Sequence, residues 1–260
     1  MADAPTIITL TSDFGLADGY VASMKAVVLT GCPDARVIDI THEIPAGDVM
    51  RGALILEATI PYFPAGTVHL AVVDPGVGSD RKGVTLASGG HYFVGPDNGF
   101  FTPFLDAPGA ITYALPEPAP DVSATFHGRD IFAPAAARLA CGTDIASTGE
   151  PLDDPVRLDW PKAEVSGDEI RGEVIYVDRF GNCVTSIRAY DLEPDVDYTV
   201  KAAGRDVGPL RKYYAEASQG EALALINSME RVEVAVNGGS AVEALGIRLG
   251  DAVVVKFTKE

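Results

Sequence analysis

Polar residues with catalytic potential follow three apolar, strand-like runs in the first half of the chain. The run TIITLT continues into Asp13, the run TVHLAVV continues into Asp74 and Arg81, and the run HYFV is followed by Asp97. In domains built on parallel strands, ligands usually lie beyond the carboxyl ends of the strands. These residues are therefore the first candidates for chemistry.

Asp13 suits the binding of a sugar diol. A carboxylate at a strand end can accept two hydrogen bonds from vicinal hydroxyl groups, which is how proteins usually hold a ribose. The alternative is that Asp13 and the nearby Asp18 cap turns, or cap the helix expected to begin near Gly19. The residues alone leave both interpretations open.

The loop after TVHLAVV can bring Asp74 and Arg81 together. Gly76 and Gly78 permit a tight turn that returns Arg81 to the strand end. A guanidinium beside Asp74 would lower the pKa of that carboxyl group, so Asp74 suits orienting a reactant better than removing a proton. An ordinary surface ion pair is the alternative.

His127 lies in the segment FHGRD, directly before a predicted helix over DIFAPAAARLA. A helix N-terminus favours a neutral imidazole or a bound anion. The alternative is a purely structural histidine. His42, His69 and His91 lack comparable glycine-flanked surroundings, and we expect them to be structural or exposed.

The composition is that of a globular protein, with 260 residues, 47% apolar content and a formal net charge of −17. This charge argues against nucleic-acid binding, which depends on Lys and Arg, and is compatible with a cationic substrate. Cys32, Cys141 and Cys183 lie far apart without CxxC spacing, which indicates reduced thiols and a cytoplasmic location. Neither a signal peptide nor an apolar run of about 18 residues is expected, so membrane insertion is not predicted.

The pattern of runs predicts two domains. Strand-like and helix-like segments alternate through residues 1–160, which predicts an α/β domain with a largely parallel sheet. The segment from Gly149 to Asp168 holds three prolines and many acidic residues, and it separates the two patterns. Short strand-like runs with Gly and Asn turns then predict a small β-barrel or sandwich over residues 168–260.

Several common motifs are absent from the sequence. It contains no GxGxxG opening a helix, no GxxxxGK[ST], no HExxH and no GxSxG. Dinucleotide, P-loop, zincin and α/β-hydrolase chemistry therefore lose their usual support. A metal-dependent hydrolase that uses Asp74, Asp97 and His127 is the main rival from the residues alone.

An ordered set of motifs resembles the S-adenosylmethionine hydroxide adenosyltransferases, the hydrolase relatives of the fluorinating and chlorinating enzymes. The motifs are TSDFG, DITHEIP, VVDPGVGSDR, VGPDNGFF, FHGRDIFAP, DRFGN, and INS followed by AVNGG. They span nearly the whole chain. The resemblance implies an N-terminal α/β domain, a C-terminal β-barrel, and a homotrimer in which the ligand lies between one subunit's N-terminal domain and a neighbour's barrel.

The resemblance also assigns roles to residues. It implies that Asp74, Arg81 and His127 are catalytic and that water attacks the 5′ carbon of S-adenosyl-L-methionine (SAM), with no cofactor or metal. We expect Arg81 to stabilise hydroxide character, and Asp74 and His127 to accept hydrogen bonds from the water. The residues implied in substrate binding are Asp13 (ribose), Asp18 (ammonium), Phe126, Asp178, Phe180, Asn182, Tyr214, Ser228 (carboxylate), and Asn237 and Gly238 (adenine).

Some alternatives stay open within this resemblance. Tyr213 competes with Tyr214 as the aromatic wall. Met229-Glu230-Arg231 departs from the small residue and glycine that often follow the serine, which affects the methionine contacts. A halogenase and a non-catalytic SAM sensor are the rival functions. Asp74, Arg81, His127 and the lack of the fluorinase's extra loop favour water as the nucleophile.

Overall fold

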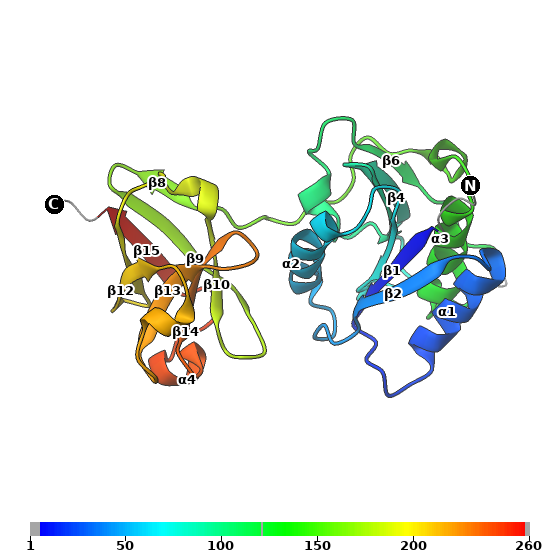
Figure 1. Ribbon diagram of the computed structural model, residues 1–260. Coiled ribbons are helices and arrows are strands. Elements are labelled where there is room, and N and C mark those ends of the chain that lie inside the picture. The colour runs from blue at the N-terminus through cyan, green and yellow to red at the C-terminus, as the bar shows by residue number, and fades with distance from the viewer. Residues whose placement is uncertain (1–5, 121, 258–260) are drawn as a thin grey trace, which may run out of the picture. The chain divides into compact units, whose positions relative to one another are not determined.

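A computed structural model of the chain describes residues 6–120 and 122–257. The first five residues and the last three lie outside the described part. The first five belong to the segment on which the signal-peptide expectation rests, and the last three belong to the second predicted domain. The chain forms two compact units that divide between Trp160 and Pro161 (Figure 1).

The N-terminal unit contains a seven-stranded mixed sheet with strand order β2-β1-β3-β5-β4-β6-β7. Its first four strands in this order pair in parallel, and the remaining pairings are antiparallel. The prediction of a largely parallel sheet is therefore confirmed for the core of this unit. The elements are β1 (Ile7–Ser12), α1 (Tyr20–Gly31), β2 (Arg36–Thr41), α2 (Val49–Thr59), β3 (Val68–Val72), β4 (Gly83–Ser88), β5 (His91–Pro96), β6 (Ile111–Ala114), α3 (Ala133–Ala140) and β7 (Glu150–Pro151).

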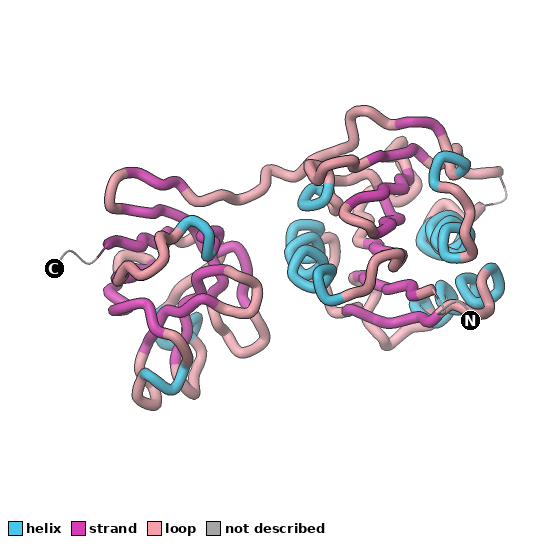
Figure 2. Tube along the Cα trace, turned by 45° about the horizontal axis from the view of Figure 1, so that its top comes forward, coloured by secondary structure: helices cyan, strands magenta, loops and turns pink. Residues whose placement is uncertain are grey.

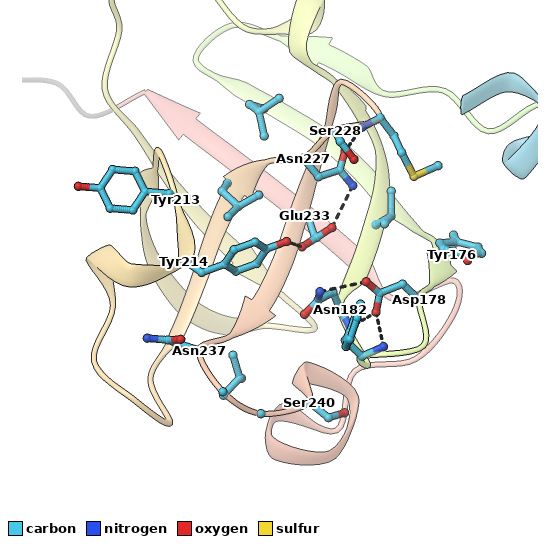
Figure 3. Close-up of a pocket in the computed structure, with 18 of the residues that line it drawn as sticks. Tyr176, Asp178, Asn182, Tyr213, Tyr214, Asn227, Ser228, Glu233, Asn237 and Ser240 are labelled. Carbon is cyan, nitrogen blue, oxygen red and sulfur yellow. Dashed lines mark hydrogen bonds between the residues drawn. The ribbon is translucent and has the colours of Figure 1, made fainter. Parts of the chain in front are cut away.

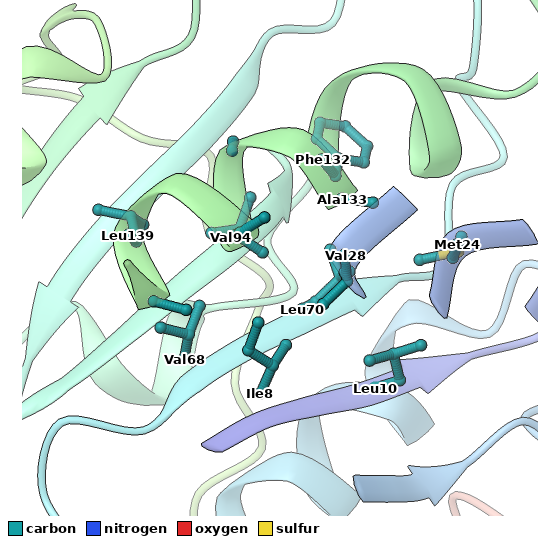
Figure 4. Close-up of a cluster of buried hydrophobic side chains, with 14 of the residues drawn as sticks. Ile8, Leu10, Met24, Val28, Val68, Leu70, Val94, Phe132, Ala133 and Leu139 are labelled. Carbon is teal, nitrogen blue, oxygen red and sulfur yellow. The ribbon is translucent and has the colours of Figure 1, made fainter. Parts of the chain in front are cut away.

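Helices cover both faces of this sheet, with α1 and α3 on one face and α2 on the other (Figure 2). The alternation along β3 explains this arrangement, because successive side chains of a strand point to opposite faces. Leu70 (Figure 4) and Val72 pack in the cluster beneath α1 and α3, whereas Ala71 and Val73 pack in the cluster that includes Leu56 of α2. Because both faces of β3 are buried, most of its successive residues are apolar, which explains the nearly continuous apolar run in the sequence.

The strand register brings the candidate residues to one edge of the sheet. Ser12 at the end of β1 pairs with Val72 at the end of β3. Asp13 and Asp74 follow these two residues almost at once, so both leave the carboxyl edge of adjacent parallel strands. The helix predicted at DIFAPAAARLA forms as a π-helical turn over Gly128–Phe132 that runs into α3.

The C-terminal unit is a closed β-barrel. The order β10-β14-β13-β12-β11-β15-β9 closes through pairing of β10 with β9, and β8 extends the sheet beside β9. Buried valines and isoleucines of these strands fill its interior. The elements are β8 (Glu164–Ser166), β9 (Glu169–Val177), β10 (Cys183–Arg188), β11 (Tyr198–Ala202), β12 (Arg205–Arg211), β13 (Ala222–Ile226), β14 (Arg231–Val236), α4 (Ala241–Leu245) and β15 (Ala252–Phe257).

The barrel prediction is thus confirmed, although two strands of this unit lack a strand-like pattern in the sequence. β8 is only three residues long, and β12 contains both Gly208 and Pro209, residue types that are depleted in strands. Within the described residues, none of the helices has both the length and the apolar character needed to cross a membrane.

Candidate active site

Asp74, Arg81 and His127 form one connected cluster at the carboxyl edge of the N-terminal sheet. Arg81 Nε donates to Asp74 Oδ1 at 2.8 Å, and Arg81 Nη2 donates to Asp74 Oδ2. Arg81 Nη2 also lies 3.0 Å from His127 Nδ1. The Asp74 and Arg81 side chains are only 5% and 11% exposed, so this is a largely desolvated bidentate pair rather than a surface ion pair.

Gly78 allows the segments that carry these residues to approach each other. It has a φ of +79°, and a Cβ added there would lie 2.6 Å from the carbonyl oxygen of Ala124. Gly128 lies beside Val72 at the end of β3, where an added Cβ would make ordinary contact at 3.5 Å from Val72 Cγ1. The loop after β3 and the turn before α3 therefore meet at the strand end, which places His127 beside Arg81.

The cluster determines the protonation state of His127. Burial and the positive charge of Arg81 lower the pKa of His127, against smaller opposing effects of Asp74 and Asp130. Because a guanidinium only donates hydrogen bonds, His127 Nδ1 must be the acceptor in the contact with Arg81. The neutral imidazole then carries its proton on Nε2, so that nitrogen is a donor.

Asp13 sits at the same edge and is held by a neighbouring loop. Its Oδ2 accepts a hydrogen bond from the backbone N–H of Gly47 at 2.8 Å. Beside it, the ring of Phe126 packs edge-on against Phe14 and Tyr20, with centroid distances of 5.9 and 5.2 Å. Asp18 lies in the same segment, between Asp13 and α1, and is exposed.

The residues of the metal alternative are not gathered into one ligand set. Asp97 Oδ1 accepts a hydrogen bond from the backbone N–H of Val156 at 2.9 Å, and so ties down the segment that leads out of the unit. Among the described residues, no three His, Cys, Asp or Glu side chains are grouped so that they could hold a metal ion.

The barrel carries a cavity of about 890 Å³ on its own surface (Figure 3). All the barrel residues named from the sequence line this one cavity, although they come from four separate segments of the unit. They are Asp178, Phe180, Asn182, Tyr213, Tyr214, Ser228, Asn237 and Gly238.

Asp178 shapes the loop that forms one wall of the cavity. Its Oδ1 accepts hydrogen bonds from the backbone N–H groups of Phe180 and Asn182 at 2.8 and 2.9 Å, and its Oδ2 accepts one from Asn182 Nδ2 at 3.0 Å. Gly181 completes this turn at a φ of +82°, where a Cβ would lie 2.1 Å from Ser240 Oγ. Phe180 is left 70% exposed at the rim.

A buried carboxylate, Glu233, lies against the same cavity and was missed from the sequence. It is 3% exposed, and it accepts hydrogen bonds from Tyr214 OH at 2.6 Å and from Asn227 Nδ2 at 3.0 Å. Burial raises the pKa of Glu233 against the effect of these two hydrogen bonds, and burial likewise raises the pKa of Tyr214. The Tyr214 hydroxyl points toward Glu233 whereas the adjacent Tyr213 points away from it (Figure 3), and the two residues are 42% and 58% exposed.

A signal for Glu233 does exist in the sequence. It is a carboxylate within RVEVAV, a run of six residues that are all buried in β14. Val232, Val234 and Val236 point into the barrel core, so Glu233 must point to the other face. A buried charge on that face requires partners, and Tyr214 and Asn227 are those partners.

Comparison with known proteins gives a matching family model for each half of the chain. The family model described as the SAM hydroxide adenosyltransferase N-terminal domain matches residues 8–149, and that of the C-terminal domain matches residues 172–254. The fold and these two matches together are those of a two-domain enzyme. The chain belongs to the SAM hydroxide adenosyltransferase family.

Individual relatives cover nearly the whole chain. A protein named (R)-S-adenosyl-L-methionine hydrolase from Salinispora tropica is 42% identical, over 98% of this chain and 99% of its own length. A protein of the same name from Thermus thermophilus is 44% identical, over 92% and 95%. The crystal structure of an uncharacterised protein from Thermotoga maritima matches with a TM-score of 0.87 and 33% identity, covering 96% and 99% of the two chains.

Proposed function

We propose that this enzyme hydrolyses S-adenosyl-L-methionine by attack of water at the 5′ carbon of the ribose. A C5′–O bond forms and the C5′–S bond breaks, with the bonding electron pair passing to sulfur. The products are adenosine, L-methionine and one proton from the water. Because the leaving group is a sulfonium that becomes a neutral thioether, its departure needs neither a general acid nor a metal, so the proposal includes no cofactor.

The observation that carries this proposal is the assembled Asp74–Arg81–His127 cluster, in a chain whose full-length relatives are named as hydrolases of this substrate. Fluorinases are more distant, at 28% to 29% identity. The cluster provides fixed polar groups around one point at a sheet edge. Such groups suit the holding of a small nucleophile more than the binding of a large ligand.

The hydrogen bonds refine the role of His127. With Nδ1 bonded to Arg81, its Nε2–H donates to the water oxygen, which differs from the acceptor role expected from the sequence. One lone pair of the water then accepts this hydrogen bond and the other is left for C5′. Each Asp74 oxygen retains a lone pair beyond its bond to Arg81, so Asp74 is the group we assign to accept a hydrogen bond from the water.

Substrate binding falls to the remaining residues. We assign the ribose diol to Asp13, the ammonium to Asp18, and a wall of the site to Phe126. In the barrel, the backbone N–H and carbonyl of Asn237 already bond to Glu221 and Gly220. We therefore assign the backbone contact with adenine to Gly238, and the carboxylate contact to Ser228.

The relatives' name also points to one form of the substrate. The prefix L fixes the α-carbon and the word adenosyl fixes the sugar, so the prefix (R) describes the sulfonium, which carries three different carbon groups and is a stereocentre. We propose that this enzyme likewise acts on the (R)-sulfonium form. Incubation with each separated form should yield adenosine from (R) and little from (S), whereas equal rates would contradict this part of the proposal.

The proposal includes a homotrimer in which each site combines one subunit's sheet edge with a neighbour's barrel cavity. Large apolar side chains are exposed in both regions: Leu16 and Tyr20 in the first are 66% and 49% exposed, and Phe180 and Tyr213 in the second are 70% and 58% exposed. Exposed apolar groups near a site are typical of an interface. The three free cysteines support the proposed cytoplasmic location.

Subunit mixing tests the shared site. Asp74→Ala removes turnover at the sheet edge and Asn182→Ala weakens binding in the barrel cavity, so each variant alone should show little activity at a SAM concentration below the wild-type KM. Trimers reassembled from both variants would contain some sites with two intact halves, and activity should return. No recovery in demonstrably mixed trimers would contradict a shared site.

The function itself is tested by chromatography of SAM incubated with the purified protein. Adenosine and methionine should appear in equal amounts and should increase with enzyme concentration, with Asp74→Ala as the inactive control. Unchanged ligand that stays bound would indicate a sensor. 5′-Chloro-5′-deoxyadenosine formed in the presence of chloride would indicate a halogenase.

A further inference from the structure

His42 joins the two segments on either side of Asp13. Its ring nitrogen Nδ1 lies 2.7 Å from Ser12 Oγ, and its backbone carbonyl accepts a hydrogen bond from Gly15 N–H at 2.8 Å. His42 is 4% exposed and Ser12 is 1% exposed. One residue therefore contacts the chain both immediately before and two residues after the Asp13 carboxylate.

An irregularity in the sheet creates this contact. Leu10 of β1 pairs with Asp39 of β2, but Thr11 pairs with Thr41, so Ile40 is an extra residue in β2. The insertion advances β2 by one residue relative to β1 at the strand end. His42, which follows Thr41, then comes beside Ser12.

The segment that begins at His42 also holds Asp13 directly. Gly47 in this segment donates its backbone N–H to Asp13 Oδ2 at 2.8 Å. The Asp13 carboxylate is thus oriented by a loop whose first residue, His42, is fixed to β1. A carboxylate that must accept hydrogen bonds from two adjacent hydroxyl groups depends on such an orientation.

The outer nitrogen of His42 faces a second, charged contact. His42 Nε2 lies 3.1 Å from Asp39 Oδ1, although its N–H bond does not point along that line, and Asp39 Oδ2 accepts a hydrogen bond from Lys25 Nζ of α1 at 2.6 Å. Burial opposes ionisation of Asp39, but its contacts with Lys25 and His42 outweigh burial and lower the pKa of Asp39. The imidazole is therefore hydrogen-bonded to Ser12 at one nitrogen and lies close to a carboxylate anchored to α1 at the other.

We propose that His42 is a positioning residue that fixes Asp13 for binding of the ribose diol. This inference rests on the proposed function, because it assumes that Asp13 holds the diol. His42 does not touch the substrate in this account. It acts through Ser12, Gly15 and the loop that ends at Gly47.

A pair of ligands separates positioning from general stability. Adenosine carries the 2′ and 3′ hydroxyl groups, and 2′,3′-dideoxyadenosine lacks both while keeping the base and the 5′ hydroxyl. The dissociation constants of both ligands are measured by calorimetry for the wild type and for His42→Ala, His42→Asn and Asp13→Ala. The thermal midpoint of each variant is recorded alongside.

We expect His42→Ala to weaken adenosine binding about tenfold while leaving the dissociation constant of the dideoxy analogue unchanged. His42→Asn places an amide where Nδ1 stood and can keep the contact with Ser12, so it should restore most of the affinity for adenosine. The combined variant with Asp13→Ala should bind adenosine no more weakly than Asp13→Ala alone.

His69→Ala is the matched control. His69 is also a fully buried histidine, and its Nδ1 also contacts a β1 hydroxyl, that of Thr9, at 2.7 Å. Thr9 lies four residues before Asp13, about 13 Å along an extended strand. His69→Ala should lower the thermal midpoint yet leave the ratio of the two dissociation constants at the wild-type value.

The outcomes distinguish the inference from its premise. If Asp13→Ala does not selectively weaken adenosine binding, the assignment of Asp13 fails, and the positioning role fails with it. If Asp13→Ala is selective but both His42 variants bind the two ligands as the wild type does, or lose both equally, only the role of His42 is overturned. Failure of the proposed reaction appears separately, as absence of adenosine from SAM with the wild-type enzyme.

Discussion

Both regions of the candidate site bury a carboxylate, but they satisfy it in opposite ways. At the sheet edge, the Asp74 side chain is 5% exposed and is paired with the guanidinium of Arg81. In the barrel cavity, Glu233 is 3% exposed and is bonded to a phenol and an amide, which are neutral donors. The pKa of Glu233 is raised accordingly, because burial disfavours its charged form.

From this difference we infer separate roles for the two regions in turnover and in binding. In the proposed reaction, the fixed opposite charges at the sheet edge polarise a small nucleophile and have no need to reorganise. Neutral, well-bonded groups in the cavity shape a surface for the larger part of the ligand. Substitutions at the sheet edge should therefore affect turnover, and substitutions in the cavity should affect binding.

The largest effect is expected for Arg81→Lys. A lysine ammonium group cannot bond both oxygens of Asp74 and contact His127 at the same time. The cluster therefore separates even though the positive charge is kept. We expect kcat to fall by about 10² to 10³, with the dissociation constant for SAM nearly unchanged. Arg157→Ala, which removes an exposed pair with Asp106, is the control and should keep wild-type kcat. A large rise in KM with normal kcat would contradict the assignment of turnover to the sheet edge.

The sheet edge should also respond to acid through His127. Its pKa lies below 6.5, and the protonated ring would place a second cation beside Arg81 and lose the acceptor at Nδ1. The ratio kcat/KM should therefore stay level as the pH falls to 6.5, and should decrease about tenfold per pH unit only below the lowered pKa. An acidic limb with an apparent pKa above 6.5 in the pH profile would contradict this state of His127.

A smaller effect on binding is expected for Glu233. Glu233→Ala leaves Tyr214 OH and the Asn227 amide without their partner, which should weaken SAM binding about tenfold, or about 1.4 kcal/mol, with a minor change in kcat. Glu233→Gln keeps the shape and an acceptor and should bind almost as the wild type does. If the glutamine variant loses affinity as fully as the alanine variant, the negative charge rather than the hydrogen bonds carries the role.

Glu233 should also influence how the free energy of unfolding depends on pH. Its folded-state pKa lies above its unfolded value of 4.5, so the folded state binds the proton more tightly. The contribution of Glu233 to the free energy of unfolding should therefore decrease as the pH rises from about 4.5 through the folded pKa, and Glu233→Gln should remove this contribution from the measured slope. An unchanged slope in pH-dependent denaturation would contradict the raised pKa.

The smallest effect is expected at Glu230, which follows the cavity-lining residues Ser228 and Met229 in the chain. Glu230 adopts a left-handed φ of 55°. Glu230→Gly should stabilise the protein by about 0.5 kcal/mol, because relief of backbone strain exceeds the added entropy of the unfolded chain. Asp195, at a φ of 60°, is the control, since Asp tolerates this region better and should gain less on replacement by glycine.

Much of the fold could be predicted from apolar runs and turn residues, and the exceptions have physical causes. β3 is readable because both of its faces are buried, whereas β12 is not, because Gly208 and Pro209 interrupt it and its place depends on pairing with β11 and β13. The edge of the sheet that carries Asp13 and Asp74 followed from strand order alone.

The finer features of the site depend on contacts between distant residues. The donor role of His127 is set by Arg81, 46 positions away in the chain. The contact of His42 with Ser12 depends on the extra residue Ile40 in β2, which no local pattern in the sequence marks. Motif order could identify the family, but it could not reveal these hydrogen bonds.

Hydrolysis in ¹⁸O-labelled water tests the central claim most directly, followed by mass spectrometry of both products. If the Asp74–Arg81–His127 cluster directs water to the 5′ carbon of SAM, the adenosine should carry one ¹⁸O at its 5′ hydroxyl and the methionine should carry none. Asp74→Ala should form neither product at a comparable rate. Unlabelled adenosine, or label in methionine instead, would contradict attack by water at C5′.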